Sequence, residues 1–116
     1  MTSAALVFNG EWDVVEQVRG SFVYRFEISE NGTVSGNGRS ASQERWTTVL
    51  EGLADEHNIK WTEYDIGNDR SQPLGEFRGG TLSKEDNVDC FPGTGVIFRT
   101  GSNLRFVFTR RGTISG

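Results

Sequence analysis

Apolar and polar residues alternate along much of this chain with a period of two residues. The clearest example spans residues 21–29, where Phe22, Tyr24, Phe26 and Ile28 lie on one face of an extended chain. The opposite face is mostly polar. This alternation is typical of a β-strand that has one face buried and the other in solvent.

Similar runs, separated by turn signals rich in Gly, Asn, Asp and Ser, predict eight strands in all. The other strands are expected at residues 13–18, 33–39, 45–50, 59–66, 74–83, 94–100 and 104–110. A helix over residues 42–54 competes with the strand at 45–50, and the stiff β-branched side chains at 47–49 favour the strand. We expect residues 1–9 to form a lead-in strand or one helical turn, and residues 84–93 a long polar connection.

Short, regularly spaced strands without a long helix, an internal repeat or a linker predict one all-β domain over residues 1–116. Because sequential strands have short connections, we expect a meander. The predicted fold is therefore a single eight-stranded antiparallel up-and-down β-barrel, with a sandwich as the alternative. The pair Gly79-Gly80 is of the kind that bends a strand at a barrel corner.

Trp12 serves as the reference that decides which face of each strand points inward. If Trp12 is inside, then Glu16 and Tyr24 share its face, and Glu63 shares the inward face of Trp61. Desolvation would raise the pKa of a carboxylate buried in this way, which suits a general acid or base. Glu16, Glu63 and Tyr24 are therefore the candidate catalytic residues. The alternative for either carboxylate is a solvated strand end or an ion pair with a nearby arginine.

Aromatic side chains on the same faces would form an apolar cup around these polar groups, as in many small-molecule sites. The candidate ligand-binding residues are Trp12, Phe26, Trp46, Trp61, Phe106 and, at a rim, Arg110. The favoured function is binding of a small hydrophobic or aromatic molecule in the barrel cavity. One alternative is a small barrel isomerase or cyclase of specialised metabolism that uses a buried Glu or Tyr. The other is a protein-binding inhibitor module that fills its barrel with its own side chains.

Several motifs resemble the calycin group, which includes lipocalins and avidins. The Gly10-x-Trp12 opening is of lipocalin type, and the stretch from Gly10 to Gly36 is similar to the start of avidin-like barrels. The resemblance implies a calycin-like barrel with a pocket, in which a basic residue near the end packs over the first Trp. The candidates for that role are Arg105, Arg110 and Arg111. Avidin-like barrels commonly pair, which makes a homo-oligomer a candidate state.

The resemblance names no ligand for this chain. The set of residues through which avidins contact biotin does not map onto it cleanly, and the lipocalin disulfides and C-terminal helix are missing from its pattern.

The net charge of −4 argues against a partner of duplex nucleic acid. A single-stranded nucleic-acid partner is a weaker alternative, based on arginines interspersed with aromatic residues at 70, 78, 99, 105, 110 and 111. No apolar run approaches the roughly 20 residues that cross a bilayer, and no signal-peptide pattern opens the chain. We therefore expect a cytoplasmic protein without a membrane partner.

Cysteine and histidine carry little chemistry in this sequence. Cys90 is the only cysteine, so no intrachain disulfide can form, and the acidic neighbour Asp89 disfavours a nucleophilic thiol. We expect Cys90 to be buried as a small apolar residue. His57, the only histidine, lies in a polar stretch and is expected at the surface. The spacing supports no metal site, and no cofactor is expected.

Overall fold

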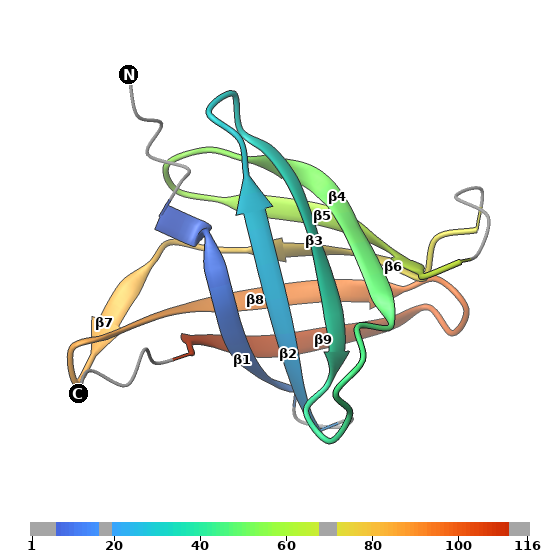
Figure 1. The fold of residues 1–116 in the computed structure, drawn as a ribbon. Coiled ribbons are helices and arrows are strands. Elements are labelled where there is room, and N and C mark those ends of the chain that lie inside the picture. The colour runs from blue at the N-terminus through green and yellow to red at the C-terminus, as the bar shows by residue number, and fades with distance from the viewer. Residues whose placement is uncertain (1–6, 17–19, 68–71, 112–116) are drawn as a thin grey trace.

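The computed structural model describes residues 7–16, 20–67 and 72–111, and in these ranges the chain is all-β (Figure 1). Its strands are β1 (Gly10–Glu16), β2 (Gly20–Ile28), β3 (Thr33–Ser40), β4 (Thr48–Ala54), β5 (Ile59–Asp65), β6 (Gly75–Gly79), β7 (Ser83–Glu85), β8 (Val88–Ile97) and β9 (Ser102–Arg110). One short 3₁₀ turn at Val7 and Phe8 precedes β1. Within the described ranges, no helix has both the length and the apolar character to cross a membrane.

The strands close into a barrel. Each strand from β1 to β5 pairs with the next, β9 pairs with both β1 and β8, and the pairing of β6 with β8 completes the ring. All of these pairings are antiparallel. The ring has eight strands, and the short β7 extends beside the first residues of β8. The predicted eight-stranded antiparallel up-and-down barrel is confirmed.

Three of the predicted segments differ from the structure. Residues 45–47 belong to a loop and β4 runs from Thr48 to Ala54, so the strand at 45–50 is correct only over residues 48–50 and the helix at 42–54 is wrong. The strand at 74–83 is divided, because β6 ends at Gly79 and β7 begins at Ser83. Residues 84–93 are not a polar connection but the β7–β8 hairpin and half of β8. Its turn has Asp86 and Asn87 at φ values of 51° and 67°, a conformation that Asn and Asp tolerate better than most residues.

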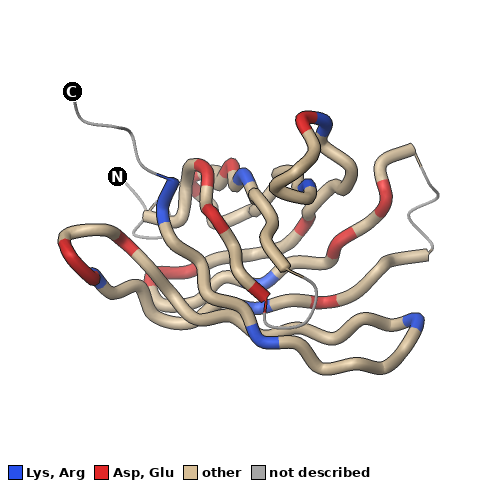
Figure 2. The backbone as a smooth tube through the Cα atoms, turned by 90° about the horizontal axis from the view of Figure 1, so that it is seen from below, with Lys and Arg blue, Asp and Glu red and all other residues tan. Residues whose placement is uncertain are grey.

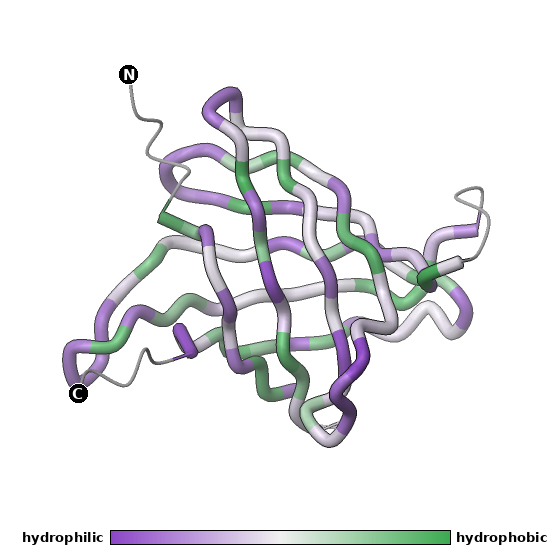
Figure 3. The backbone as a smooth tube through the Cα atoms, viewed as in Figure 1, coloured by the Kyte–Doolittle hydropathy of each residue, from purple (hydrophilic) through white to green (hydrophobic). Residues whose placement is uncertain are grey.

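The inner face of the barrel is built from large aromatic side chains beside glycines. Figure 3 shows apolar and polar positions alternating along the strands. A Cβ at Gly95 would lie 2.0 Å from Cδ2 of Phe77, and one at Gly79 would lie 2.4 Å from Cε2 of Phe91. The missing side chains on the wall therefore provide the space that the rings occupy.

One end of the barrel is closed by Trp12 and Arg110. The Arg110 guanidinium lies 4.4 Å from the centre of the Trp12 ring, and Trp12 Nε1 donates a hydrogen bond of 2.9 Å to the Phe8 carbonyl. Arg110 also donates to the Asn9 carbonyl at 2.6 Å and to Asp89 at 2.9 Å. Of the three basic candidates, Arg110 is thus the one that packs over the first Trp. We call this the closed end.

Candidate functional site

The other end of the barrel, which we call the mouth, contains both candidate carboxylates. The up-and-down order brings the last residues of β1 and β5 to the same end as the first residues of β2 and β4. Glu16 is the last residue of β1, and Glu63 lies near the end of β5. Both are buried, with 2% of Glu16 and 7% of Glu63 exposed. The inward placement expected for the two residues is therefore observed, while their catalytic role stays a prediction.

A hydrogen-bonded cluster surrounds Glu63. The Tyr24 hydroxyl donates to Glu63 Oε1 at 2.8 Å, and Trp61 Nε1 lies 3.3 Å from the same oxygen. The Tyr24 and Trp61 rings meet edge to face, with centres 5.8 Å apart. Since β3 and β4 separate β2 from β5 in the sheet, the bond between Tyr24 and Glu63 crosses the interior of the barrel. Hydrogen bonds from neutral donors to a carboxylate are stronger than those between neutral groups.

Gly38 makes this crossing possible. A Cβ on Gly38 would lie 2.9 Å from Cε1 of Tyr24 and 2.7 Å from Oγ1 of Thr48. The tyrosine ring and the threonine hydroxyl therefore both occupy space next to Gly38 at the mouth. Thr48 Oγ1 is buried and makes no hydrogen bond to the described residues. The sequence did not single out Thr48; its place opposite Gly38 in the ladder is the signal that reveals it.

Apolar side chains form the rim of the mouth. Phe22 at the start of β2 and Ile97 at the end of β8 are half-buried and pack against the core. Two further apolar side chains, on the connecting segments, are more open, with 52% of Ile66 and 46% of Phe98 exposed. Phe106, a predicted ligand contact, is buried beside Glu16 as its cross-strand partner.

The barrel below the mouth is filled by its own aromatic rings. Phe26 and Trp61 have ring centres 5.0 Å apart, and Phe91 and Phe108 stack at 4.5 Å. None of these four side chains exposes more than 3% of its surface. Of the predicted ligand contacts, Phe26 lies in this packed layer, and Trp12 and Arg110 lie at the closed end. Arg110 thus lies at the opposite end of the barrel from Glu16 and Glu63.

Trp46 does not join the aromatic interior, so the position predicted for it is wrong. Its ring lies 5.0 Å from the Arg25 guanidinium and 5.2 Å from that of Arg39. Arg25 alternates along β2 with the inward Tyr24 and Phe26, so this contact lies on the outer wall. Trp46 precedes β4, so the alternation of that strand does not direct its side chain inward. The cation–π contacts with the two arginines hold its indole on the outer wall.

The remaining candidates have structural surroundings. His57 is exposed, with Nε2 3.3 Å from Glu56, and Cys90 is buried as expected, with Ser83 Oγ 3.5 Å from its sulfur. The backbone N–H groups of His57 and Asn58 donate to Asp55 and lower its pKa. The residues described contain no group of three or more His, Cys, Asp and Glu side chains that could hold a metal ion.

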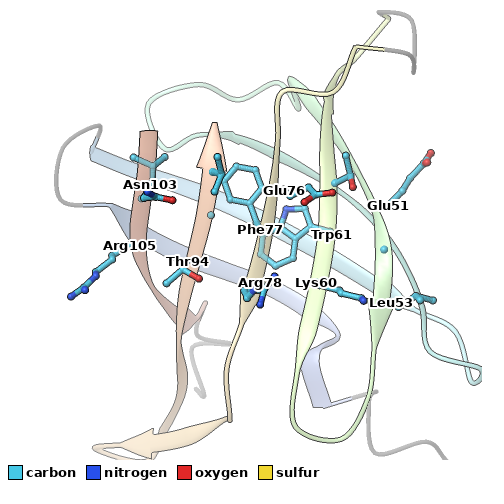
Figure 4. Close-up of a pocket in the computed structure, with 15 residues that line it drawn as sticks. Glu51, Leu53, Lys60, Trp61, Glu76, Phe77, Arg78, Thr94, Asn103 and Arg105 are labelled. Carbon is cyan, nitrogen blue, oxygen red and sulfur yellow. The ribbon is translucent and has the colours of Figure 1, made fainter. Parts of the chain in front are cut away.

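A hollow lies on the outer wall of the barrel. This groove has a volume of about 680 Å³ and crosses β4, β5, β6, β8 and β9 (Figure 4). Most of its lining side chains, such as Lys60, Glu76 and Arg105, are exposed and alternate with inward residues. The sequence did not predict it, because the groove depends on which outward residues become cross-strand neighbours.

Neither a scan of protein-family models nor a search of the curated proteins finds a match for this chain. The closed eight-stranded barrel is compatible with the calycin-type fold. Any assignment of function therefore rests on the geometry of the mouth and of the outer groove.

Proposed function

We propose that this protein binds a small molecule with an apolar or aromatic body at the mouth of its barrel. The observation that carries the proposal is the cluster of Glu63, Tyr24 and Thr48, placed among apolar rim residues. Tyr24 and Glu63 are joined by a hydrogen bond of 2.8 Å, and the nearby Thr48 Oγ1 is buried without a hydrogen-bond partner among the described residues. A few convergent polar groups in an apolar setting are the usual composition of a ligand site.

A barrel with a purely structural role needs no buried polar side chains at its mouth. Burying a carboxylate costs several kcal/mol unless hydrogen bonds compensate it, and a buried hydroxyl without a partner adds a further penalty. The Thr48 hydroxyl incurs that penalty, and a buried carboxylate such as Glu63 requires dedicated donors, here Tyr24 and Trp61, that an apolar layer would not need. Departures of this kind from an apolar core are expected at functional sites. The ligand would place its apolar body against Phe22, Ile97 and the rim, and a polar group near Thr48 and Glu63.

An isomerase or cyclase is the second candidate, and the bond between Tyr24 and Glu63 is what favours it. A phenol that donates to a carboxylate gives a site one group that can supply a proton and one that can accept it. Rings packed around the pair would hold a reactive conformer of an apolar substrate. The two candidates share one site and differ in whether bound ligand is converted.

The protein-binding alternative receives support from the filled interior. A module that acts through its loops needs no cavity, and the buried, stacked rings of Phe91 and Phe108 occupy part of the interior. That alternative gives no role to the buried carboxylates at the mouth, so we rank it below ligand binding.

The test is a fluorescence titration with a panel of apolar and aromatic small molecules. Trp61 donates to Glu63, so a ligand at the mouth should change its emission in a saturable way. Thr48→Val and Glu63→Gln should each weaken binding by about tenfold if they lose one hydrogen bond to the ligand. Glu85→Gln is the matched control, because Glu85 is exposed on β7, outside the barrel ring.

The outcomes separate the three candidates. A ligand that binds and stays unchanged supports the carrier. A ligand that is converted by the wild type, and is bound but not converted by Glu63→Gln, supports the enzyme. If no compound in the panel changes the emission, ligand binding at the mouth is rejected and the protein-binding module takes its place.

A further inference from the structure

Two parallel rows of side chains border the groove on the outer wall. One row, which we call the cationic bank, follows consecutive cross-strand partners: Leu53, Lys60, Arg78, Thr94 and Arg105. The other, the acceptor bank, follows Glu51, Thr62, Glu76, Val96 and Asn103. Between the banks lies a third set of cross-strand partners that includes Trp61 and Phe77. Their backbone forms the floor of the groove, and their rings are buried on the inner side of the barrel wall.

The geometry of a sheet fixes the dimensions of this groove. Residues two apart on a strand are separated by about 7 Å, so the banks are about that far apart. Five adjacent strands at about 4.8 Å spacing make the groove about 19 Å long. These dimensions suit a narrow, extended molecule that lies across the strands. Figure 4 shows side chains of both banks, including Glu76 and Arg78.

The cationic bank contains an unfavourable arrangement. Lys60 and Arg78 are direct cross-strand partners, and like charges in that relation destabilise a sheet. Among the described residues, neither side chain, nor that of Arg105, forms an ion pair. Lysines and arginines elsewhere are scattered over the molecule (Figure 2), and the net charge is −4. A bound anionic group would relieve the repulsion between Lys60 and Arg78, with the Thr94 hydroxyl between Arg78 and Arg105 as a further donor.

The acceptor bank restricts the class of anion. Glu51 and Glu76 would repel a chain that carries negative charge on all sides, and Asn103 adds an amide to the same bank. A single-stranded nucleic acid would also find no exposed ring on which to stack its bases, since Trp61 and Phe77 are buried. The occupant must therefore present acid groups to one side and hydrogen-bond donors to the other.

An acidic peptide meets this requirement poorly. Extended peptides commonly bind a sheet through backbone hydrogen bonds at a free edge. The floor of this groove is formed by strands whose backbone groups are engaged in ladders on both sides. A chain of acidic sugars fits better, because its carboxylates can face the cationic bank while its hydroxyls donate to Glu51, Glu76 and Asn103.

We propose that the groove formed by the cationic and acceptor banks is a binding site for an acidic oligosaccharide. The carboxylates of its uronic acid units interact with Lys60, Arg78 and Arg105. The site lies on the outer wall, and the side chains of the two banks point away from the interior that contains Glu63.

The experiment is a calorimetric titration of the whole chain at low salt with a tetramer of galacturonic acid. An uncharged glucose tetramer, a tetra-aspartate peptide and a four-nucleotide oligothymidylate are titrated in parallel. We expect saturable binding of the acidic sugar alone, with weaker binding as salt is added. Arg78→Gln should reduce the affinity about tenfold, as expected for one lost charged hydrogen bond.

Two controls make the result specific. Arg99→Gln removes an exposed arginine outside the groove and should leave the affinity unchanged. Arg78→Gln should also keep or raise the melting temperature of the free protein, because it removes the like-charge pair. An equal loss of affinity in Arg99→Gln, tighter binding of the peptide or the oligonucleotide, or no binding of the acidic sugar would each overturn the proposal.

Discussion

At the scale of single residues, the hydrogen bond from Tyr24 to Glu63 is the contact that defines the mouth. Tyr24→Phe removes the hydroxyl and leaves the buried carboxylate with one donor fewer, while the ring and its packing stay. We expect the free energy of unfolding to fall by about 1–3 kcal/mol, as for other buried polar groups that lose a partner. Urea denaturation of the wild type and the variant measures the change.

A double-mutant cycle provides the control for this prediction. Tyr24→Phe and Glu63→Gln should be non-additive, with a coupling energy of about 0.5–3 kcal/mol, because the two residues share one hydrogen bond. Additive effects would show that the hydroxyl and the carboxylate stabilise the barrel independently, and that the cluster is not a unit.

The alternation of the strands was sufficient to place Glu16, Tyr24 and Glu63 inside. It was sufficient because each lies at an even spacing from buried residues of its own strand, such as Trp12 and Val14 before Glu16. Trp46 was misplaced because its surroundings depend on Arg25 and Arg39, which lie on β2 and β3. A contact between a loop and an outer wall has no period in the sequence from which it could be predicted.

The lowered pKa of Asp55 predicts how the stability of the protein depends on pH. The backbone N–H groups of His57 and Asn58 lower its pKa below the ordinary value of 3.8. Because the pKa in the folded state lies below that in the unfolded state, the charged carboxylate stabilises the fold above the unfolded-state pKa. This contribution is lost as the pH falls through the folded-state pKa. Asp55→Asn should therefore be less stable than the wild type at neutral pH, and the difference should disappear in acid.

Thermal unfolding of both proteins from neutral to strongly acidic pH measures this difference. Glu30→Gln, at an exposed carboxyl in the β2–β3 turn, is the control and should follow the wild type at every pH. A stability difference between Asp55→Asn and the wild type that is the same at all pH values would contradict the prediction.

At the scale of elements, glycines on the inner wall decide how closely strands and rings pack. A Cβ at Gly95 would lie 2.0 Å from Cδ2 of Phe77, so Gly95→Ala forces that ring out of its packed position. Overpacking of this kind costs about 1–3 kcal/mol, and more where nothing can move. We expect a loss of at least this size in chemical denaturation.

Gly80→Ala is the matched control for that substitution. The nearest atom to a Cβ at Gly80 is Cγ of Pro92 at 3.5 Å, an ordinary contact, so its effect should be much smaller. Equal losses in Gly80→Ala and Gly95→Ala would point to backbone freedom as the cause instead of ring packing.

Strand positions were predictable where the alternation of apolar and polar residues was long. They were less predictable where the residues of a turn determined the end of one strand and the start of the next. Residues 21–29 were assigned almost to their observed bounds, because large apolar side chains occupy every second position. The β7–β8 hairpin was missed because its turn uses Asp86 and Asn87 without a glycine. Its exposed, polar β7 also lacks the alternation that a buried face imposes.

At the scale of the whole molecule, the meander correctly predicted a closed barrel, but not which end is closed. The strand pattern placed Arg110 at a rim because it ends the last strand, and only the calycin resemblance made it, with Arg105 and Arg111, a candidate to pack over Trp12. In the structure Arg110 joins β9 to the segment before β1 and to β8, through Asn9 and Asp89. Contacts between residues a hundred positions apart depend on how the ring closes, and no local pattern encodes them.

At the closed end, the adjacent residues Arg110 and Arg111 should contribute very different amounts to the free energy of unfolding. Arg110→Met removes the cation over Trp12 and the donors to Asn9 and Asp89, and should lower the free energy of unfolding by about 2–4 kcal/mol. Arg111→Met removes an exposed ion pair, with 3.8 Å between the Arg111 and Asp13 side chains, and should cost at most about 1 kcal/mol. Guanidinium denaturation of both variants measures the difference. Similar losses would show that Arg110 contributes only its charge at the surface. A large loss confined to Arg110 would instead show that this side chain holds β9 to β8 and to the segment before β1 at the closed end.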